Sequence, residues 1–472
     1  MADTAPVLQG SPRAFTPAPA PAPEPAPDSA PAAGPDPVTK NDAAPKNDSA
    51  ARTGPATRTG AETRAGSAPP TGPMARTASE PRTGSETASV PAPAADPASV
   101  TRARQLLAVR PVADGHNGLP WTLRLRSGHD LTPGHYYDLD LADATLHTSF
   151  PALRAGGVGA QFWSVHVPPG AVGDRAVSAT LDQIDFVHTL VRSYPESLRL
   201  ALTADAIGDA RNRGRIASLL GAASGHAIDS SLGTLRGLHG LGVRTMALTH
   251  DRNTPWADSA LDEPRAGGLT LFGEEVIREM NRLGMLIDLS MSSVDVMRHT
   301  LALSKAPVLF SHSAAAALTG RPGDVPDDIL ERLPVNGGLC MVTFEPARMA
   351  RGTGPATLAD VADHLDHVRE VAGASHVGLS GCYDGGPETQ PATATDGTYE
   401  PLPRPRGLED ASRYPYLIAE LLDRGWSETD IAKLTWENTL RVLRGAEFTA
   451  RAGGPRRAPS MATIARLDGA RR

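Results

Sequence analysis

The chain contains 472 residues, of which 40% are hydrophobic and 4% are aromatic, and it has a formal net charge of −7. This length suits one large domain or two ordinary ones, and the hydrophobic fraction is sufficient for a buried core. The acidic balance disfavours nucleic acid as a partner, because phosphate binding needs a clustered basic surface, and only two cysteines, Cys340 and Cys382, exclude a disulfide framework.

The sequence carries no signal for membrane attachment. No apolar run approaches the roughly 20 residues that a membrane helix needs. The N-terminus lacks the basic start and apolar stretch of a secretory signal, and the C-terminus lacks the apolar tail of a lipid anchor. We therefore expect a cytoplasmic protein with no membrane partner.

Residues 1–105 differ in composition from the rest of the chain. Ala, Pro, Gly, Ser and Thr dominate, so the segment cannot bury enough apolar surface to offset its ordering entropy, and we expect it to be disordered. Residues 51–86 form a degenerate hexapeptide repeat with arginine in the second place of five of its six units. We interpret the repeat as an expanded linker; the alternative is a weakly basic tether for an acidic partner.

Residues 106–447 alternate between short apolar runs and amphipathic stretches. Eight such runs with a helix or long crossover after each predict a closed, parallel (β/α)8 TIM-like barrel. The expected strands lie near 110–116, 157–165, 215–222, 243–250, 284–290, 306–312, 337–344 and 376–382.

Two stretches are typical of helices, and the end of the chain is not. Residues 272–283 place apolar side chains on one helical face. Residues 408–443 predict two closing helices, with Ser427 as an N-cap. The Arg-rich residues 448–472 are expected to form a loose basic tail.

Several motifs in this region resemble the membrane (renal) dipeptidase family. Residues 114–121 read DGHNGLPW, close to the family's D-G-H-N-D-L-P. GGVGAQFWSV at 156–165, LTHDRNTPWAD at 248–258, REMNRLGMLIDLS at 278–290 and VPDD at 325–328 are equally similar. The similarity covers residues 108 to 445 and implies the barrel fold, zinc-dependent dipeptide hydrolysis and a homodimer.

The resemblance also implies which residues would bind metal. The family site is described as two zinc ions held by five protein ligands, including a bridging Glu that separates the two dications. Two ligand positions keep histidine, namely His116 and His312. The other three fall on Gly118, Ala223 (the bridging position) and Met291, which offer zinc no suitable donor.

Three further family positions fall on residues of interest. The acid/base Asp corresponds to Cys382, and the Arg that holds the substrate carboxylate corresponds to Gly323, with Arg321 nearby. The substrate-binding His is retained as His250. The remaining histidines, His166 among them, are expected to be surface or core residues.

The scaffold motifs are kept whereas ligand positions are lost, which predicts a pseudo-dipeptidase with no zinc or at most one ion. Such a protein would bind a dipeptide or small amide, as a homodimer or as a hetero-dimer with an active relative.

Two other interpretations remain open. In the first, the chain is an active dipeptidase or amide hydrolase. It would use a single metal held by His116, His312 and Cys382, or a Cys382 thiolate beside His250. In the second, Met291 packs at the barrel mouth, and His116 and His312 are relics that hydrogen bond to neighbours.

Overall fold

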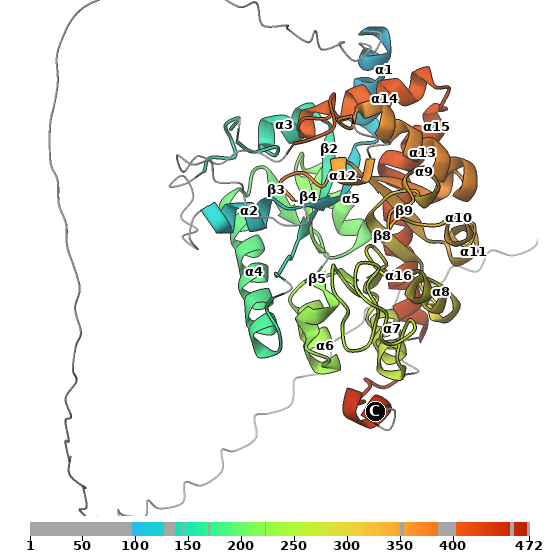
Figure 1. The fold of residues 1–472 in the computed structure, drawn as a ribbon. Coiled ribbons are helices and arrows are strands. Elements are labelled where there is room, and N and C mark those ends of the chain that lie inside the picture. Colours follow the sequence, from blue (N-terminus) through green and yellow to red (C-terminus); the bar gives the residue numbers. More distant parts are fainter. Residues whose placement is uncertain are drawn as a thin grey trace, which may run out of the picture. The chain divides into compact units, whose positions relative to one another are not determined.

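The computed structural model describes residues 97–126, 137–143, 145–168, 170–221, 223–349, 354–385, 403–453 and 457–469. Most of the segment predicted to be disordered, including the hexapeptide repeat, lies outside these residues. Residues 97–105, however, belong to helix α1 (Pro97–Val109), so the predicted boundary at residue 105 is too late. The helix forms because Val100, Ala103 and Leu107 recur at helical spacing and are buried, and Figure 1 shows it beside α14.

The described strands form one parallel sheet that closes into a barrel. Hydrogen bonding gives the order β3-β4-β2-β1-β10-β9-β8-β7-β6-β5. A parallel bridge between Leu220 and Val243 joins β4 to the start of β6 and closes the ring. The strands are β1 (Val112–Asn117), β2 (Val158–Ser164), β3 (Leu198–Leu200), β4 (Ile216–Gly221), β5 (Ala223–Ser224), β6 (Thr245–Ala247), β7 (Leu286–Asp288), β8 (Val308–Ser313), β9 (Leu339–Thr343) and β10 (Val377–Ser380).

The predicted (β/α)8 TIM-like barrel is therefore confirmed. Each of the eight predicted ranges overlaps a strand of the ring. The prediction missed two strands: the two-residue β5, which pairs only with β6, and β3, which pairs only with β4 and lies outside the ring. The three residues of β3 are too few to give a period-two pattern.

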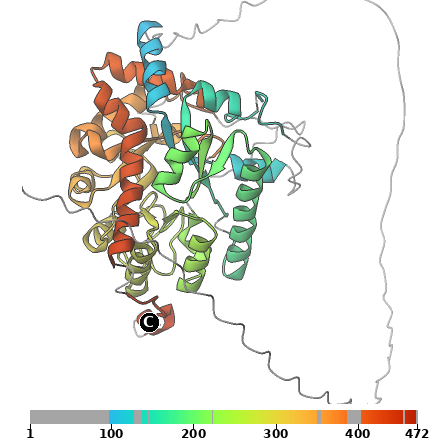
Figure 2. The same ribbon diagram turned by 180° about the vertical axis from the view of Figure 1, so that it is seen from behind.

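Helices surround the barrel, as Figures 1 and 2 show from opposite sides. None of those in the described ranges is both long and apolar enough to span a bilayer. Besides α1 they are α2 (Leu119–Arg126), α3 (Phe150–Ala155), α4 (Asp174–Ser193), α5 (Ala204–Asn212), α6 (Leu232–Gly240), α7 (Leu271–Leu283), α8 (Val294–Leu303), α9 (Ala316–Thr319), α10 (Asp327–Leu330), α11 (Leu333–Asn336), α12 (Pro346–Met349), α13 (Leu358–Ala372), α14 (Tyr414–Asp423), α15 (Glu428–Ala432), α16 (Asn438–Gly453) and α17 (Ile464–Asp468).

The predicted helix at 272–283 is α7. It begins where the Thr270 side chain accepts a hydrogen bond from the Gly273 amide, and it ends at Gly284 in a left-handed conformation. Phe272, Val276 and Met280 are fully buried, as their spacing predicted. The closing helices are also confirmed, because Ser427 caps α15 through the Asp430 amide.

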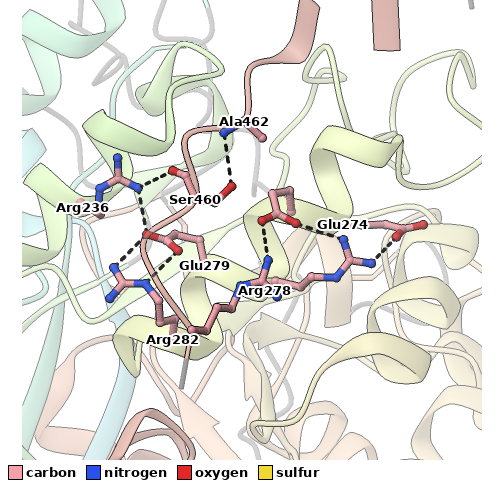
Figure 3. Close-up of polar contacts among 9 residues, drawn as sticks. Arg236, Glu274, Arg278, Glu279, Arg282, Ser460 and Ala462 are labelled. Atoms are coloured by element: carbon pink, nitrogen blue, oxygen red, sulfur yellow. Dashed lines mark hydrogen bonds and ion pairs between the residues drawn. The ribbon is translucent and has the colours of Figure 1, made fainter. Parts of the chain in front are cut away.

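The described part of the C-terminal tail contacts α7, although the sequence analysis expected it to be loose. Figure 3 shows Arg236 donating a hydrogen bond to the Ser460 carbonyl and another to Glu279. The Glu279 side chain is fully buried and also accepts from Arg282. Ser460 therefore holds this segment against the ion-pair network, although most of residues 457–469 are exposed.

Candidate functional site

A cavity of about 260 Å³ opens at the carboxyl ends of the barrel strands. Parallel barrels place their functional residues at this end, because the loops that follow the strands converge there. Six of the seven predicted site positions line this one cavity: His116, Gly118, His250, Met291, His312 and Cys382. The seventh, Ala223, lies on β5 beside Ser224, which also lines the cavity.

His116 and His312 lie against each other. Their ring centroids are 4.5 Å apart. Burial lowers the pKa of His312 to about 3, with the charge of Arg348 as the next cause. Burial and the neighbouring His312 hold the pKa of His116 well below its usual value. Both imidazoles are therefore neutral at physiological pH, the form that accepts a hydrogen bond or binds a metal.

The orientation of His312 is fixed by a chain of hydrogen bonds. Ser311 Oγ donates to the buried carboxylate of Asp288 and lies 2.7 Å from His312 Nδ1. Because the hydroxyl proton is used toward Asp288, Nδ1 must be the donor to Ser311 Oγ. The lone pair of His312 Nε2 is therefore left for the cavity. By contrast, Nδ1 of His116 is buried with no hydrogen-bond partner among the described residues.

The backbone around Gly118 leaves no space for a side chain. A Cβ atom at this position would lie 2.4 Å from the Asp384 carbonyl oxygen, 2.5 Å from Gly385 Cα and 2.7 Å from Gly385 N. The Gly118 amide also donates to the Tyr383 carbonyl oxygen at 2.8 Å. The loop after β10 is thus packed directly on the end of β1, and an Asp here would require that loop to move.

Met291 contacts a buried arginine that the sequence analysis did not identify. Its Sδ atom lies 2.9 Å from Nη1 of Arg348. Arg348 lies on the short helix α12, which follows β9. Nε of Arg348 donates to Asp324 at 2.8 Å, and Nη2 donates to the Gly323 carbonyl oxygen at 2.7 Å. Arg348 thus fills the space beside Gly323. No motif or spacing marks it, because its role depends on a contact between separate loops.

Cys382 is held as a thiol. Its Sγ atom lies 3.2 Å from Thr343 Oγ1 and 3.6 Å from Ser380 Oγ. Burial raises its pKa to about 12, so the reactive thiolate is not formed at neutral pH. His250 is directed elsewhere, because its Nδ1 lies 3.2 Å from the carboxylate of Asp251. This geometry does not favour the hypothesis of a Cys382 nucleophile.

Two nearby carboxylates are bonded to other groups and do not line the cavity. Asp114 accepts hydrogen bonds from the Gly381 and His116 amides, and burial raises its pKa to about 6. Asp384 is paired with His147, with 3.2 Å between Oδ1 and Nδ1. Neither lines the cavity, where the described wall includes a single acidic residue, Glu345.

The cavity wall includes an aromatic group that the sequence analysis missed. His166 was expected to be a surface or core residue, but it lines the cavity between Trp121 and His250. Its ring centroid is 5.4 Å from that of Trp121 and 5.5 Å from that of His250. Burial lowers its pKa to about 3. Its position two residues after β2 was the available signal, since residues there face the barrel mouth.

The acidic and sulfur-containing residues of the region do not converge on one point. Across the described ranges, no group of three or more His, Cys, Asp or Glu side chains is placed to hold a metal ion. His116, His312 and Cys382 share the cavity without forming such a group. A pair of zinc ions also needs an anion between them, and the described cavity wall offers only Glu345. The residues described here therefore do not fit a two-zinc centre.

Comparison with known proteins identifies the family. The family described as membrane dipeptidase (peptidase family M19) matches residues 100–454. Dipeptidase 3 of Mus musculus is 41% identical over 359 residues, which is 75% of this chain and 68% of that protein. Dipeptidase verJ of Clonostachys rogersoniana is 40% identical over 361 residues, 74% of this chain and 87% of that protein.

Solved structures agree on the fold. A metallo peptidase from Rhodobacter sphaeroides, liganded with a phosphinate mimic of the dipeptide L-Ala-D-Ala, has a TM-score of 0.61 at 22% identity. The match covers 71% of this chain and 99% of that one. From its sequence motifs, its barrel and these relatives, the chain belongs to the membrane dipeptidase family.

Proposed function

We propose that this chain is a pseudo-dipeptidase, which keeps the barrel and the cavity of its family but binds its ligand without hydrolysing it. The observation that carries the proposal is the contact at Gly118. A metal-binding carboxylate at the end of β1 has no space there, because the backbone of Asp384 and Gly385 already fills it.

The chemistry of the other positions supports the same conclusion. Water becomes a nucleophile at neutral pH when a metal lowers its pKa toward about 7. His116 and His312 alone are a weak ligand set for that metal. Met291 contributes a neutral thioether, and the buried Cys382 thiol cannot replace a carboxylate as a general acid or base near pH 7. We expect no zinc, or at most one ion.

The cavity suits a small ligand with hydrogen-bond donors and an apolar part. His312 Nε2 offers a lone pair, Glu345 offers a carboxylate, and Trp121 and His166 offer flat apolar surfaces. A dipeptide or a small amide has the matching groups and fits a cavity of about 260 Å³. We propose such a ligand, bound by a homodimer or by a hetero-dimer with an active relative.

The test combines metal analysis with an activity assay on the full-length chain. Zinc is measured by inductively coupled plasma mass spectrometry after purification without chelators, and hydrolysis is followed with a panel of dipeptides. An active family member serves as the positive control, and the double variant H116A/H312A serves as the background.

We expect well under two zinc ions per chain and no turnover above the background variant. Turnover that is abolished by chelator and by H116A/H312A would contradict the proposal and support a mononuclear dipeptidase or amide hydrolase. Turnover that resists chelator but is lost in C382S would instead support the cysteine alternative.

A further inference from the structure

We propose that Arg348, the buried one of two arginines in the described cavity wall beside the exposed Arg321, keeps divalent metal ions away from His116 and His312. The inference rests on the proposed function, because it concerns how a metal-poor site is maintained. Arg348 lies outside the motifs that resemble the family, and its charge would act in addition to the loss of metal ligands.

The nitrogen atoms of the Arg348 guanidinium differ in their hydrogen-bond partners. Nε and Nη2 are used by Asp324 and by the Gly323 carbonyl oxygen, and Asp324 itself is buried. Nη1 contacts only the thioether of Met291, at 2.9 Å, among the described residues. A thioether is a weak hydrogen-bond acceptor. Nη1 of Arg348 therefore carries positive charge without a strong hydrogen-bond acceptor among the described residues.

The positive end of the ion pair faces the cavity. Arg348 and Met291 both line the cavity, whereas Asp324 does not. The pair is buried, so solvent and salt screen it little. His312 lines the same cavity as Arg348. A metal ion on His312 Nε2 would meet the positive end of this ion pair, while the negative end lies on the side away from the cavity wall.

The position of Met291 makes the proposal testable. Its backbone is left-handed, with φ of 64°, a conformation that histidine tolerates better than most residues. Met291→His would thus add a third imidazole to the cavity that His116 and His312 line, next to Arg348. If the missing ligands were the sole reason that the cavity does not bind zinc, this substitution alone should create a measurable zinc site.

The experiment compares zinc affinity in four variants of the full-length chain. The first three are M291H, M291H/R348K and M291H/R348M/D324N. The fourth is M291H/R348M/D324N with H116A and H312A added. Zinc binding is measured by competition with a chromophoric chelator, and cobalt absorption spectra report imidazole coordination independently. The D324N change is included because R348M alone would leave a buried carboxylate unpaired. Thermal melts of each variant confirm that it is folded.

We expect M291H and the charge-keeping M291H/R348K to bind zinc no better than the variant without His116 and His312. M291H/R348M/D324N should bind at least about tenfold more tightly than either. Tight zinc binding by M291H with Arg348 in place would overturn the inference. So would the absence of any gain in a folded M291H/R348M/D324N. In both cases the proposed function is judged separately, by the zinc content of the unmodified chain.

Discussion

The contact at Gly118 leads to a direct prediction about stability. Gly118→Ala adds one methyl group, which would lie 2.4 to 2.7 Å from three backbone atoms of Asp384 and Gly385. Backbone cannot rotate aside as a flexible side chain can, so the loop after β10 must shift. That shift strains the hydrogen bond from the Gly118 amide to Tyr383. Overpacking of this kind costs typically 1–3 kcal/mol, and we expect about 3 kcal/mol here because all three contacts are with backbone.

The assay is chemical denaturation of the folded chain, followed by circular dichroism and tryptophan fluorescence. The control is Gly208→Ala on α5, where an added Cβ has no atom within 4 Å. In a helix this change should be neutral or stabilise by up to about 1 kcal/mol. If the Gly118→Ala variant unfolds at the same denaturant midpoint as wild type, the loop after β10 moves at little cost. Our argument that position 118 has no space for a metal-binding side chain would then fail.

The same contact bears on restoring the family's ligands. A combined variant with Gly118→Asp, Ala223→Glu, Met291→His and Cys382→Asp recovers zinc only if the older geometry still exists. With the loop packed on Gly118 and Arg348 in place, we expect this variant to be destabilised and to bind little zinc. Stoichiometric zinc in it would show that the scaffold readily returns to a metal-binding state.

Three further predictions concern folding, pH and assembly. Removal of residues 1–94 should leave the melting temperature unchanged, whereas removal of residues 1–109 should lower it, because α1 buries Val100, Ala103 and Leu107; equal melts of the two shortened chains would contradict this. Burial raises the pKa of Asp114 to about 6 in the folded state, so the carboxyl holds its proton better there than when unfolded. Its contribution to stability is present at low pH and is lost as the pH rises from about 4 through 6. The difference in stability between wild type and D114N should therefore fall by roughly 3 kcal/mol over that window, and a flat difference would refute the assignment. Light scattering at micromolar concentration should give a dimer, and a monomer alone would leave only the hetero-dimer proposal.

The sequence by itself determined the fold and the identity of most site positions. The barrel could be predicted because each strand is a short apolar run and each connecting helix shows its own periodicity, both of which are local properties. Motifs such as the one at 114–121 then located His116 and Gly118 at the end of β1. The boundary at α1 was missed because Val100, Ala103 and Leu107 are few apolar residues next to a long polar segment.

The tertiary structure decided what those site residues can do. Position 118 has no space for a side chain because a loop more than 250 residues later in the chain packs on Gly118. Arg348 reaches Met291 and Asp324 from a different loop, and His166 enters the wall through its contacts with Trp121 and His250. Contacts of this kind depend on how the loops of a closed barrel converge at its mouth. Spacing along the chain carries no information about them.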